Sequence, residues 1–181
     1  MATINAVSFL EDRSIESICR RVKAAGFDGL EVSRPPFFEK LTTSETRERF
    51  AAFAAEQGLR LYGFDCWVDV LPYANMSETI DGFRQAVEFA RELDLGMVIS
   101  HDPWAKDNDD RSPQQCLEAS WELFRRVADM CAVDDLLLVF EPHPDTLSMD
   151  DDWCIEFIDG LEHDNVGVLY DCCHYGVGQP K

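Results

Sequence analysis

Four consecutive residues, Asp171 to His174, bring together a carboxylate, two thiols and an imidazole. Such a set has three chemical interpretations: a thiolate metal site, a redox pair of cysteines, or a carboxylate–histidine site in which the thiols take no part. Adjacent cysteines supply a closed thiolate zinc site poorly, because its four ligands need wider spacing along the chain. A disulfide between Cys172 and Cys173 would be strained. We therefore favour Asp171-x-x-His174 as the active part, with both cysteines filling space.

A second carboxylate, Glu141, ends the apolar run LLLVFE. If that run and VGVLYD are neighbouring parallel strands, Glu141 and Asp171 end them in one register, about one strand spacing (~4.8 Å) apart. The loop after the second strand can fold His174 back over Asp171. Two carboxylates and an imidazole suit a divalent ion such as Mn²⁺, Mg²⁺, Co²⁺ or Zn²⁺. The alternatives are a plain ion pair of Glu141 with an arginine and a structural hydrogen bond between Asp171 and His174.

Further polar and aromatic side chains lie at or just after the ends of apolar runs, and we consider them candidates for substrate binding. They are Glu31, Asp65, Trp67, His101, Trp104 and His143. Each has an ordinary structural alternative: the tryptophans can cover the rim of the fold instead of stacking on a sugar, and His143 can be a plain loop histidine. Glu31 either orients a ligand or ties neighbouring strands together.

The elements that would position these residues alternate between apolar runs and amphipathic helical patterns. The sequence predicts strands at 3–9, 29–33, 59–65, 97–101, 136–141 and 166–171. Helices between them are expected to begin at Ser14, at a capping box of Thr42 and Glu45, near Ser77, at Ser112-Pro113, and at Ser148 followed by acids at 150–152. A strand–helix period of ~30–40 residues is typical of βα units on a parallel sheet.

Two architectures have such units, a doubly wound open sheet and a (β/α)8 barrel. No G-x-G-x-x-G or P-loop motif follows a predicted strand, which removes the main nucleotide-binding reason for the open sheet. Polar residues end five successive strands, as in a barrel whose site lies at the C-terminal ends of its strands. We therefore predict an α/β fold of the (β/α)8 TIM-barrel type, with about six βα units in a single partial domain spanning residues 1–181.

The same stretches resemble a known family. FEPHP (140–144) and VGVLYDCCHYGVGQP (166–180) resemble the fifth and sixth strands of the xylose isomerase-like TIM-barrel superfamily of sugar phosphate isomerases and epimerases. AAGFDGLEVS (24–33) and AVEFARELDLGMVIS (86–100) resemble earlier parts of that barrel more loosely. The resemblance implies a barrel truncated after its sixth strand. We expect this chain alone to be inactive and, with two open sheet edges, to self-associate as a homo-oligomer or aggregate.

The family resemblance also implies residue roles. In that family the metal is held by a Glu after strand five, an Asp after strand six, a His after strand seven and a Glu after strand eight. Glu141 and Asp171 match the first two, and His174 matches a histidine that contacts substrate near the metal. The implied activity is isomerisation or epimerisation of a sugar, ketose or keto-polyol by proton abstraction alpha to a carbonyl through an enediolate, with Glu141 as one of two acid/base groups.

Other activities of the same superfamily are alternatives. An inosose-type dehydratase uses the same proton abstraction. A metal-dependent apurinic endonuclease would need further histidines after strands three and four, of which His101 is one, and a basic face for DNA. A non-catalytic barrel fragment is the remaining alternative.

The charge is strongly acidic, with 35 Asp and Glu against 16 Lys and Arg and a net charge of −19. Such a protein repels phosphate backbones, so we expect a small-molecule substrate and no nucleic acid partner. Only 4 of the 16 basic residues are lysines, a pattern that fits either a protein adapted to concentrated salt or an ordinary acidic cytosolic protein. Without a signal peptide, a ~20-residue apolar run or a C-x-x-C pair, we expect a cytoplasmic protein with reduced thiols and no membrane partner.

Overall fold

Six parallel strands form one sheet with the order β1-β2-β3-β4-β5-β6. The computed structural model describes residues 3–5, 14–34, 37–68, 75–101, 104 and 111–178. The strands are β1 (Thr3–Asn5), β2 (Gly29–Ser33), β3 (Arg60–Asp65), β4 (Met97–His101), β5 (Leu137–Glu141) and β6 (Val166–Val168). Parallel strands that neighbour one another in chain order are the topology of a (β/α)8 barrel, so the predicted fold class is confirmed as a partial barrel.

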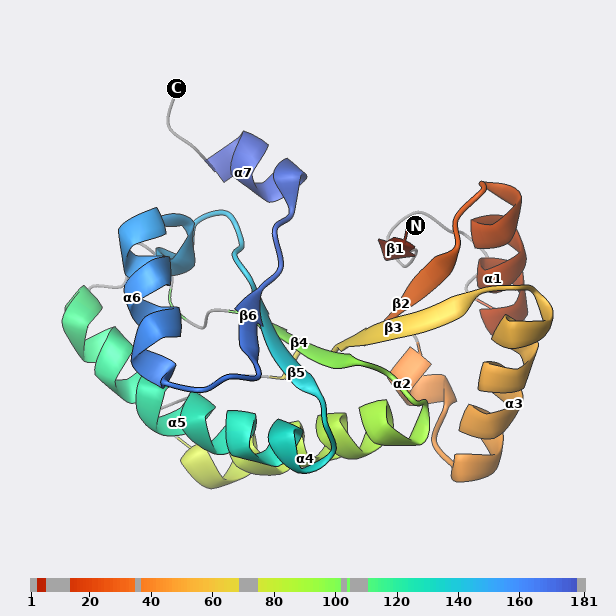
Figure 1. Cartoon of the computed structure of the whole chain (residues 1–181), viewed down its shortest axis with the longest axis horizontal. Coiled ribbons are helices and arrows are strands. Elements are labelled where there is room, and N and C mark those ends of the chain that lie inside the picture. The colour runs from red at the N-terminus through yellow and green to blue at the C-terminus, as the bar shows by residue number, and fades with distance from the viewer. Residues whose placement is uncertain are drawn as a thin grey trace.

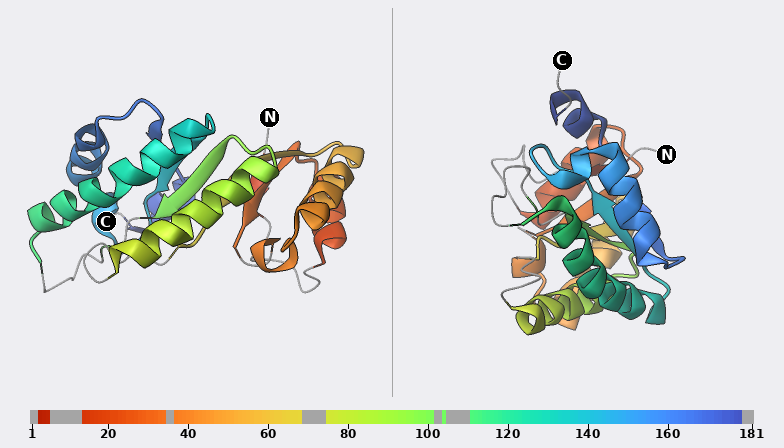
Figure 2. Two further views of the ribbon diagram at one scale, coloured as in Figure 1. Left: turned by 90° about the horizontal axis from the view of Figure 1, so that it is seen from below. Right: turned by 90° about the vertical axis from the view of Figure 1, so that its left-hand side faces the viewer.

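Helices cover the outer side of this sheet (Figure 1). They are α1 (Ile15–Ala24), α2 (Phe37–Lys40), α3 (Ser44–Glu56), α4 (Met76–Glu92), α5 (Pro113–Val133) and α6 (Asp151–Leu161), with a 3-10 turn η2 (Leu147–Met149) and a short α7 (Cys172–Gly178) after β6. Figure 2 shows α4 and α5 running side by side on that outer side. The opposite face of the sheet is its inner side, and the polar residues at the ends of the strands lie there.

Packing between β5 and its helices fixes the direction in which Glu141 points. Phe140 is 2% exposed and contacts Phe124 of α5 and Phe157 of α6, with both ring centroids 4.7 Å from its own. Successive side chains of a strand point to opposite faces. Because the side chain of Phe140 packs against the helices, the side chain of its neighbour Glu141 points to the inner side of the sheet.

Two of the predicted helix starts are confirmed in detail. Ser14 accepts a hydrogen bond from the backbone nitrogen of Ser17 at the start of α1. At the start of α5, Ser112 and Gln115 exchange backbone and side-chain hydrogen bonds in a capping box, and Pro113 occupies the first turn. These caps satisfy backbone groups that a helix leaves unpaired at its N-terminus.

Two other predicted starts are wrong in register. The capping box of α3 is formed by Thr43 and Thr46, one residue later than predicted. Helix α6 is capped by Asp150, whose Oδ1 accepts a 3.0 Å hydrogen bond from the backbone nitrogen of Trp153, whereas Ser148 lies in the preceding 3-10 turn. In both places several neighbouring residues can cap, and tertiary packing decides between them.

The sixth strand is shorter than predicted. Its pairing with β5 ends at Val168, opposite Phe140, so Asp171 follows the strand instead of ending it. Oδ1 of Asp171 accepts a 2.6 Å hydrogen bond from the backbone nitrogen of Cys173, and the chain continues as α7. Of the first predicted strand, residues 3–5 are described as β1, and 6–9 lie outside the described residues.

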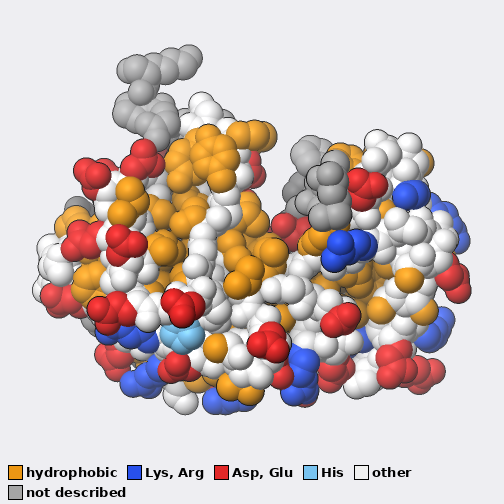
Figure 3. Space-filling view, viewed as in Figure 1, with side chains coloured by type: hydrophobic (Ala, Val, Ile, Leu, Met, Phe, Trp, Pro, Cys, Tyr) orange, Lys and Arg blue, Asp and Glu red, His pale blue; other side chains and the backbone are white. Residues whose placement is uncertain are grey.

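Apolar side chains are exposed near β6. The face shown in Figure 3 is hollowed between the two ends of the sheet, and hydrophobic side chains gather on the β6 side of the hollow. In β6 and just after it, Val168 and Tyr170 are 43% and 68% exposed. Within the described ranges, no helix combines the length and apolar character that a membrane span requires.

Candidate metal centre

Glu141 is the central residue of the site, at the C-terminal end of β5. Its side chain is 14% exposed, and its two oxygens face different histidines. Oε1 lies 3.6 Å from Nδ1 of His174, while Oε2 lies 3.7 Å from Nε2 of His143 and 4.0 Å from Nδ1 of His101. His101 and Glu141 are direct register partners across β4 and β5. The sheet thus brings four of the predicted site residues together.

Asp171 and His174 approach Glu141 from the start of α7. Nε2 of His174 lies 3.8 Å from Oδ2 of Asp171, and its Nδ1 lies 3.0 Å from the carbonyl oxygen of Pro142. A carbonyl only accepts hydrogen bonds, so Nδ1 carries the proton and the lone pair of the neutral ring lies on Nε2, towards Asp171. One ligand atom from each of Glu141, Asp171 and His174 lies within 4.8 Å of the others. These three residues form a candidate ligand group.

The environment keeps Asp171 ionised. Partial burial by itself raises the pKa of this carboxyl, but the hydrogen bond from the backbone of Cys173, together with the positive charge that His174 carries when its ring is protonated, outweighs burial and holds the pKa below its usual value. A carboxylate must be deprotonated to bind a cation. Asp171 therefore satisfies this condition at neutral pH.

Asp65 holds two neighbouring side chains in place. Its side chain is 4% exposed; Oδ2 accepts a 2.7 Å hydrogen bond from the indole of Trp67, and Oδ1 lies 3.0 Å from Nε2 of His101. The carboxylate fixes the tautomer of His101 with the proton on Nε2, which leaves the lone pair on Nδ1, facing Glu141. Burial lowers the pKa of His101, but the hydrogen bond and charge of Asp65 and the charge of Glu141 outweigh it, so the pKa is raised.

The hydrogen bonds that link Trp67, Asp65 and His101 were not predicted from the sequence. There the three residues were considered as separate pocket residues. Asp65 and His101 are 36 positions apart. The sequence offers one indication of this contact. Both residues end adjacent predicted strands of a parallel sheet, where an acidic and a basic side chain can meet. In this geometry Asp65 positions a histidine, and direct contact of Asp65 with substrate stays a prediction.

The aromatic rings above Glu141 form a row. Ring centroids are 4.7 Å apart for Trp67 and His101, 4.3 Å for His101 and His143, and 4.2 Å for His143 and His174. Trp67 has a φ of 41°, a left-handed backbone conformation that residues other than glycine rarely adopt. Such strain tends to occur at functional sites, where the surrounding structure holds it. The hydrogen bond to Asp65 is one contact that does so here.

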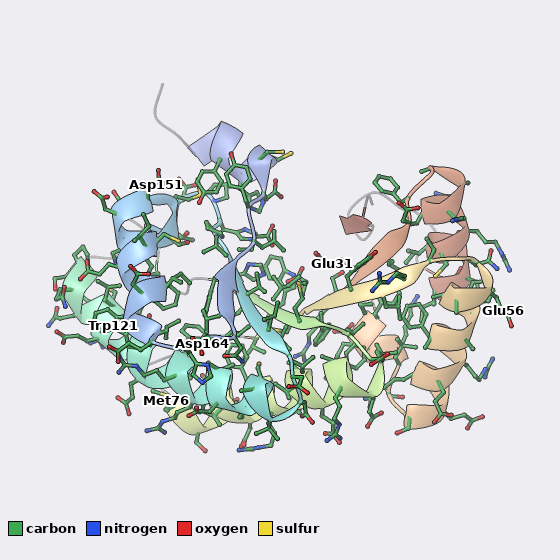
Figure 4. The ribbon with its side chains drawn as sticks, viewed as in Figure 1. Glu31, Glu56, Met76, Trp121, Asp151 and Asp164 are labelled. Carbon is green, nitrogen blue, oxygen red and sulfur yellow. The ribbon has the colours of Figure 1, made fainter. Side chains whose placement is uncertain are left out.

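Two predicted pocket residues lie apart from this cluster. The indole of Trp104 donates a 2.9 Å hydrogen bond to Ser120 of α5, so the ring is turned to the helical layer. Glu31 lies in β2, three strands from β5 in the sheet order. Figure 4 shows Glu31 on the inner side of the arc of strands. Among the described residues it belongs to none of the candidate ligand groups.

The cysteines fall into two classes. Cys172 and Cys173 are exposed at the start of α7, so the prediction that they fill space is wrong, because the chain leaves the sheet after β6. With Asp171 they form a further candidate ligand group at the surface. The other five are buried free thiols, and burial raises the pKa of Cys66 and of Cys131 to about 12. Thiols with such values are unreactive at neutral pH.

Comparisons with solved structures agree with the fold. The IOLI protein with a bound zinc atom superposes with a TM-score of 0.83 at 15% identity, over 99% of this chain and 65% of that one. D-psicose 3-epimerase with D-tagatose from Clostridium cellulolyticum H10 has a TM-score of 0.81 at 17% identity, over 100% and 67%. The 3-keto-D-glucoside 4-epimerase YcjR from E. coli has 0.78 at 15%, over 100% and 72%. At these identities the likeness concerns the fold alone.

The chain spans 65% of the length of the first of these proteins. No curated protein matches the sequence. The family model described as xylose isomerase-like TIM barrel matches residues 19–179, which is most of the chain. The protein therefore belongs to the xylose isomerase-like TIM-barrel family.

Proposed function

We propose that this protein is a divalent-metal-dependent isomerase or epimerase of a sugar, ketose or keto-polyol. The observation that carries the proposal is the convergence of Glu141, Asp171 and His174 within 4.8 Å of one another. They lie on the side of the sheet where β5 and β6 end, which is where barrel enzymes have their active sites. Two of the similar solved structures carry the name epimerase, which supports this reaction class.

The residues present fit a divalent cation. Glu141 and Asp171 are the proposed ligands, and the low pKa of Asp171 favours the ionised form that a cation needs. Carboxylate oxygens with a nearby imidazole suit Mn²⁺, Mg²⁺, Co²⁺ or Zn²⁺. A bound ion would polarise the carbonyl and neighbouring hydroxyl of a substrate and so acidify the proton alpha to the carbonyl.

Glu141 is the proposed acid/base group for that proton. Oε1 lies on the side of His174, and Oε2 faces His143 and His101. Oε2 is the proposed proton-holding atom, because buried ring nitrogens of His143 and His101 lie 3.7 and 4.0 Å from it. His174, held through Pro142, is proposed to contact the substrate beside the metal.

The test is exchange of the substrate's alpha proton with solvent. Candidate ketoses are incubated with protein and Mn²⁺ in D₂O, and deuterium incorporation is followed by NMR. When further βα units or a second chain complete the barrel, wild-type protein is expected to exchange, and Glu141→Gln to lose at least ~100-fold in rate, since general acid–base catalysis contributes ~10²–10⁴-fold. Glu122→Gln is the matched control, because Glu122 pairs with Arg126 on the outer helix α5. Equal rates for the two variants would contradict the assignment.

Related activities give different products in the same experiment. A dehydratase would lose water after the same proton abstraction, so its product would show a loss of mass of one water. One solved structure of similar fold is named as a probable 3-DHS dehydratase, at 18% identity. An endonuclease is less favoured, because a net charge of −19 repels DNA.

A further inference from the structure

Cys172 and Cys173 are the exposed thiols of the chain, and the proposed proton transfer uses neither of them. The other five cysteines, all within the described residues, are buried. In a strand, successive side chains point to opposite faces. Because β6 ends at Val168 and α7 begins at Cys172, the two thiols are free of that alternation. One ligand atom from each thiol and one from Asp171 lie within 4.8 Å of one another.

The backbone holds the carboxylate of Asp171 beside the thiols. Its Oδ1 accepts a 2.6 Å hydrogen bond from the backbone nitrogen of Cys173. This bond joins residues two positions apart, so it keeps the carboxylate in the cluster without help from Glu141. Two thiolates and a carboxylate at such separations repel one another, and a cation among them offsets the repulsion.

The adjacent thiols are better placed to share an ion than to form a disulfide. A disulfide needs its sulfurs about 2.05 Å apart. Two thiolates bound at about 2.3 Å to one tetrahedral ion lie about 3.8 Å apart. The sulfurs of Cys172 and Cys173 are unbonded and within 4.8 Å of each other, so sharing an ion needs less movement. Thiolates select soft or borderline cations such as Zn²⁺, whereas Mg²⁺ and Mn²⁺ prefer oxygen.

We propose that Cys172, Cys173 and Asp171 bind a thiophilic divalent cation of the Zn²⁺ type at the surface of the protein. The site shares Asp171 with the group around Glu141, but its two sulfurs select a different ion. Two sulfurs and one oxygen leave the fourth tetrahedral position to water, which makes the site open. A net charge of −19 raises the local concentration of cations and so favours binding. The site does not rest on the proposed function.

The test is titration of the full chain with Cd²⁺, a thiophilic probe whose bonds to thiolates absorb in the ultraviolet. A phosphine reductant and nitrogen keep the thiols reduced. Wild-type protein is expected to show this absorption, with one thiolate-bound ion per chain. Cys172→Ser and Cys173→Ser should each weaken that ion by at least ~10–100-fold, the loss caused by removing even an outer hydrogen-bond partner of a ligand. The double variant should lose the absorption, although five buried cysteines remain.

Carboxylate variants separate this site from the group around Glu141. Glu141→Ala is expected to keep the cadmium–thiolate absorption. Asp171→Asn should weaken the ion, although its amide oxygen can still accept the hydrogen bond from Cys173. Asp152→Asn, which alters an exposed aspartate in the first turn of α6, is the matched control and should leave the affinity unchanged. Equal affinities for the two aspartate variants would overturn the three-ligand site.

Circular dichroism of each variant identifies those that remain folded, and only folded variants are compared. Absence of the absorption in the wild type would overturn the proposal. So would one ion per two chains, because the thiols would then bridge copies of the protein, and so would loss of the absorption in folded Glu141→Ala. Absence of isomerase activity alongside a filled cadmium site would contradict the proposed function and leave this site intact.

Discussion

Among individual residues, Asp65 is a buried carboxylate held by hydrogen bonds, and the contribution of Trp67 to it can be measured. Trp67→Phe keeps an aromatic ring but removes the indole donor to Asp65. Hydrogen bonds to charged groups contribute about 1.5–3 kcal/mol, so urea unfolding should show a loss of that order. Trp104→Phe removes a bond to the neutral hydroxyl of Ser120 and should cost only about 0.5–1.5 kcal/mol. Equal losses would contradict the assigned role of Asp65.

The raised pKa of His101 predicts a pH dependence in metal-free protein. An imidazole whose pKa is higher in the folded than in the unfolded state stabilises the fold fully below the unfolded value of about 6.5, and this contribution is lost as the pH rises through the folded pKa. With a chelator present, His101→Gln should therefore reduce the free energy of unfolding more at about pH 6 than at about pH 8.5. The same reduction at both values would show that Asp65 and Glu141 do not favour the charged ring.

The sequence predicted which side chains gather at the site better than it predicted which of them form hydrogen bonds with one another. Glu141, Asp171 and His174 converge as expected, because strand ends and a short loop determine their positions. The bond between Asp65 and His101 depends on a three-dimensional register between β3 and β4 and on side-chain rotamers, which a single sequence does not encode locally.

Among the secondary-structure elements, α5 and α6 pack so closely that there is no room for an added methyl group at their contact. A Cβ added at Gly160 would lie 2.3 Å from a ring carbon of Trp121, a side chain that also donates to the carbonyl of Phe157. Gly160→Ala should therefore destabilise by about 1–3 kcal/mol in thermal or urea unfolding, although alanine favours helix. Gly176→Ala, in α7 with no atom within 4 Å of the added carbon, is the control and should not destabilise. Destabilisation by Gly176→Ala but not by Gly160→Ala would contradict this packing.

Element types were predictable from the sequence, and their ends were less so. The strand–helix alternation follows from hydrophobic periodicity, which is a strong local signal. The end of β6 at Val168 and the short helix α7 were not foreseen, because the apolar run continues to Tyr170 while pairing with β5 stops earlier. The consequence is local: Asp171 is presented by a helix start and not by a strand.

At the scale of the whole molecule, charge sets the expected response to salt. With a net charge of −19, self-repulsion destabilises the folded state at low ionic strength. If the acidic, lysine-poor surface is adapted to brine, the melting temperature should rise markedly between low salt and molar KCl, since screening removes that repulsion. A flat or falling curve would favour an ordinary acidic protein instead.

Glu141 and Asp171 are proposed to hold a divalent cation, and calorimetric titration with Mn²⁺ measures this binding. Mn²⁺ prefers oxygen donors, so it reports on the carboxylates. Binding is expected in the wild type, in Cys172→Ser and in Cys173→Ser, and is expected to be lost in Glu141→Ala and Asp171→Ala. Loss of binding in the cysteine variants, with retention in the carboxylate variants, would contradict Glu141 and Asp171 as ligands.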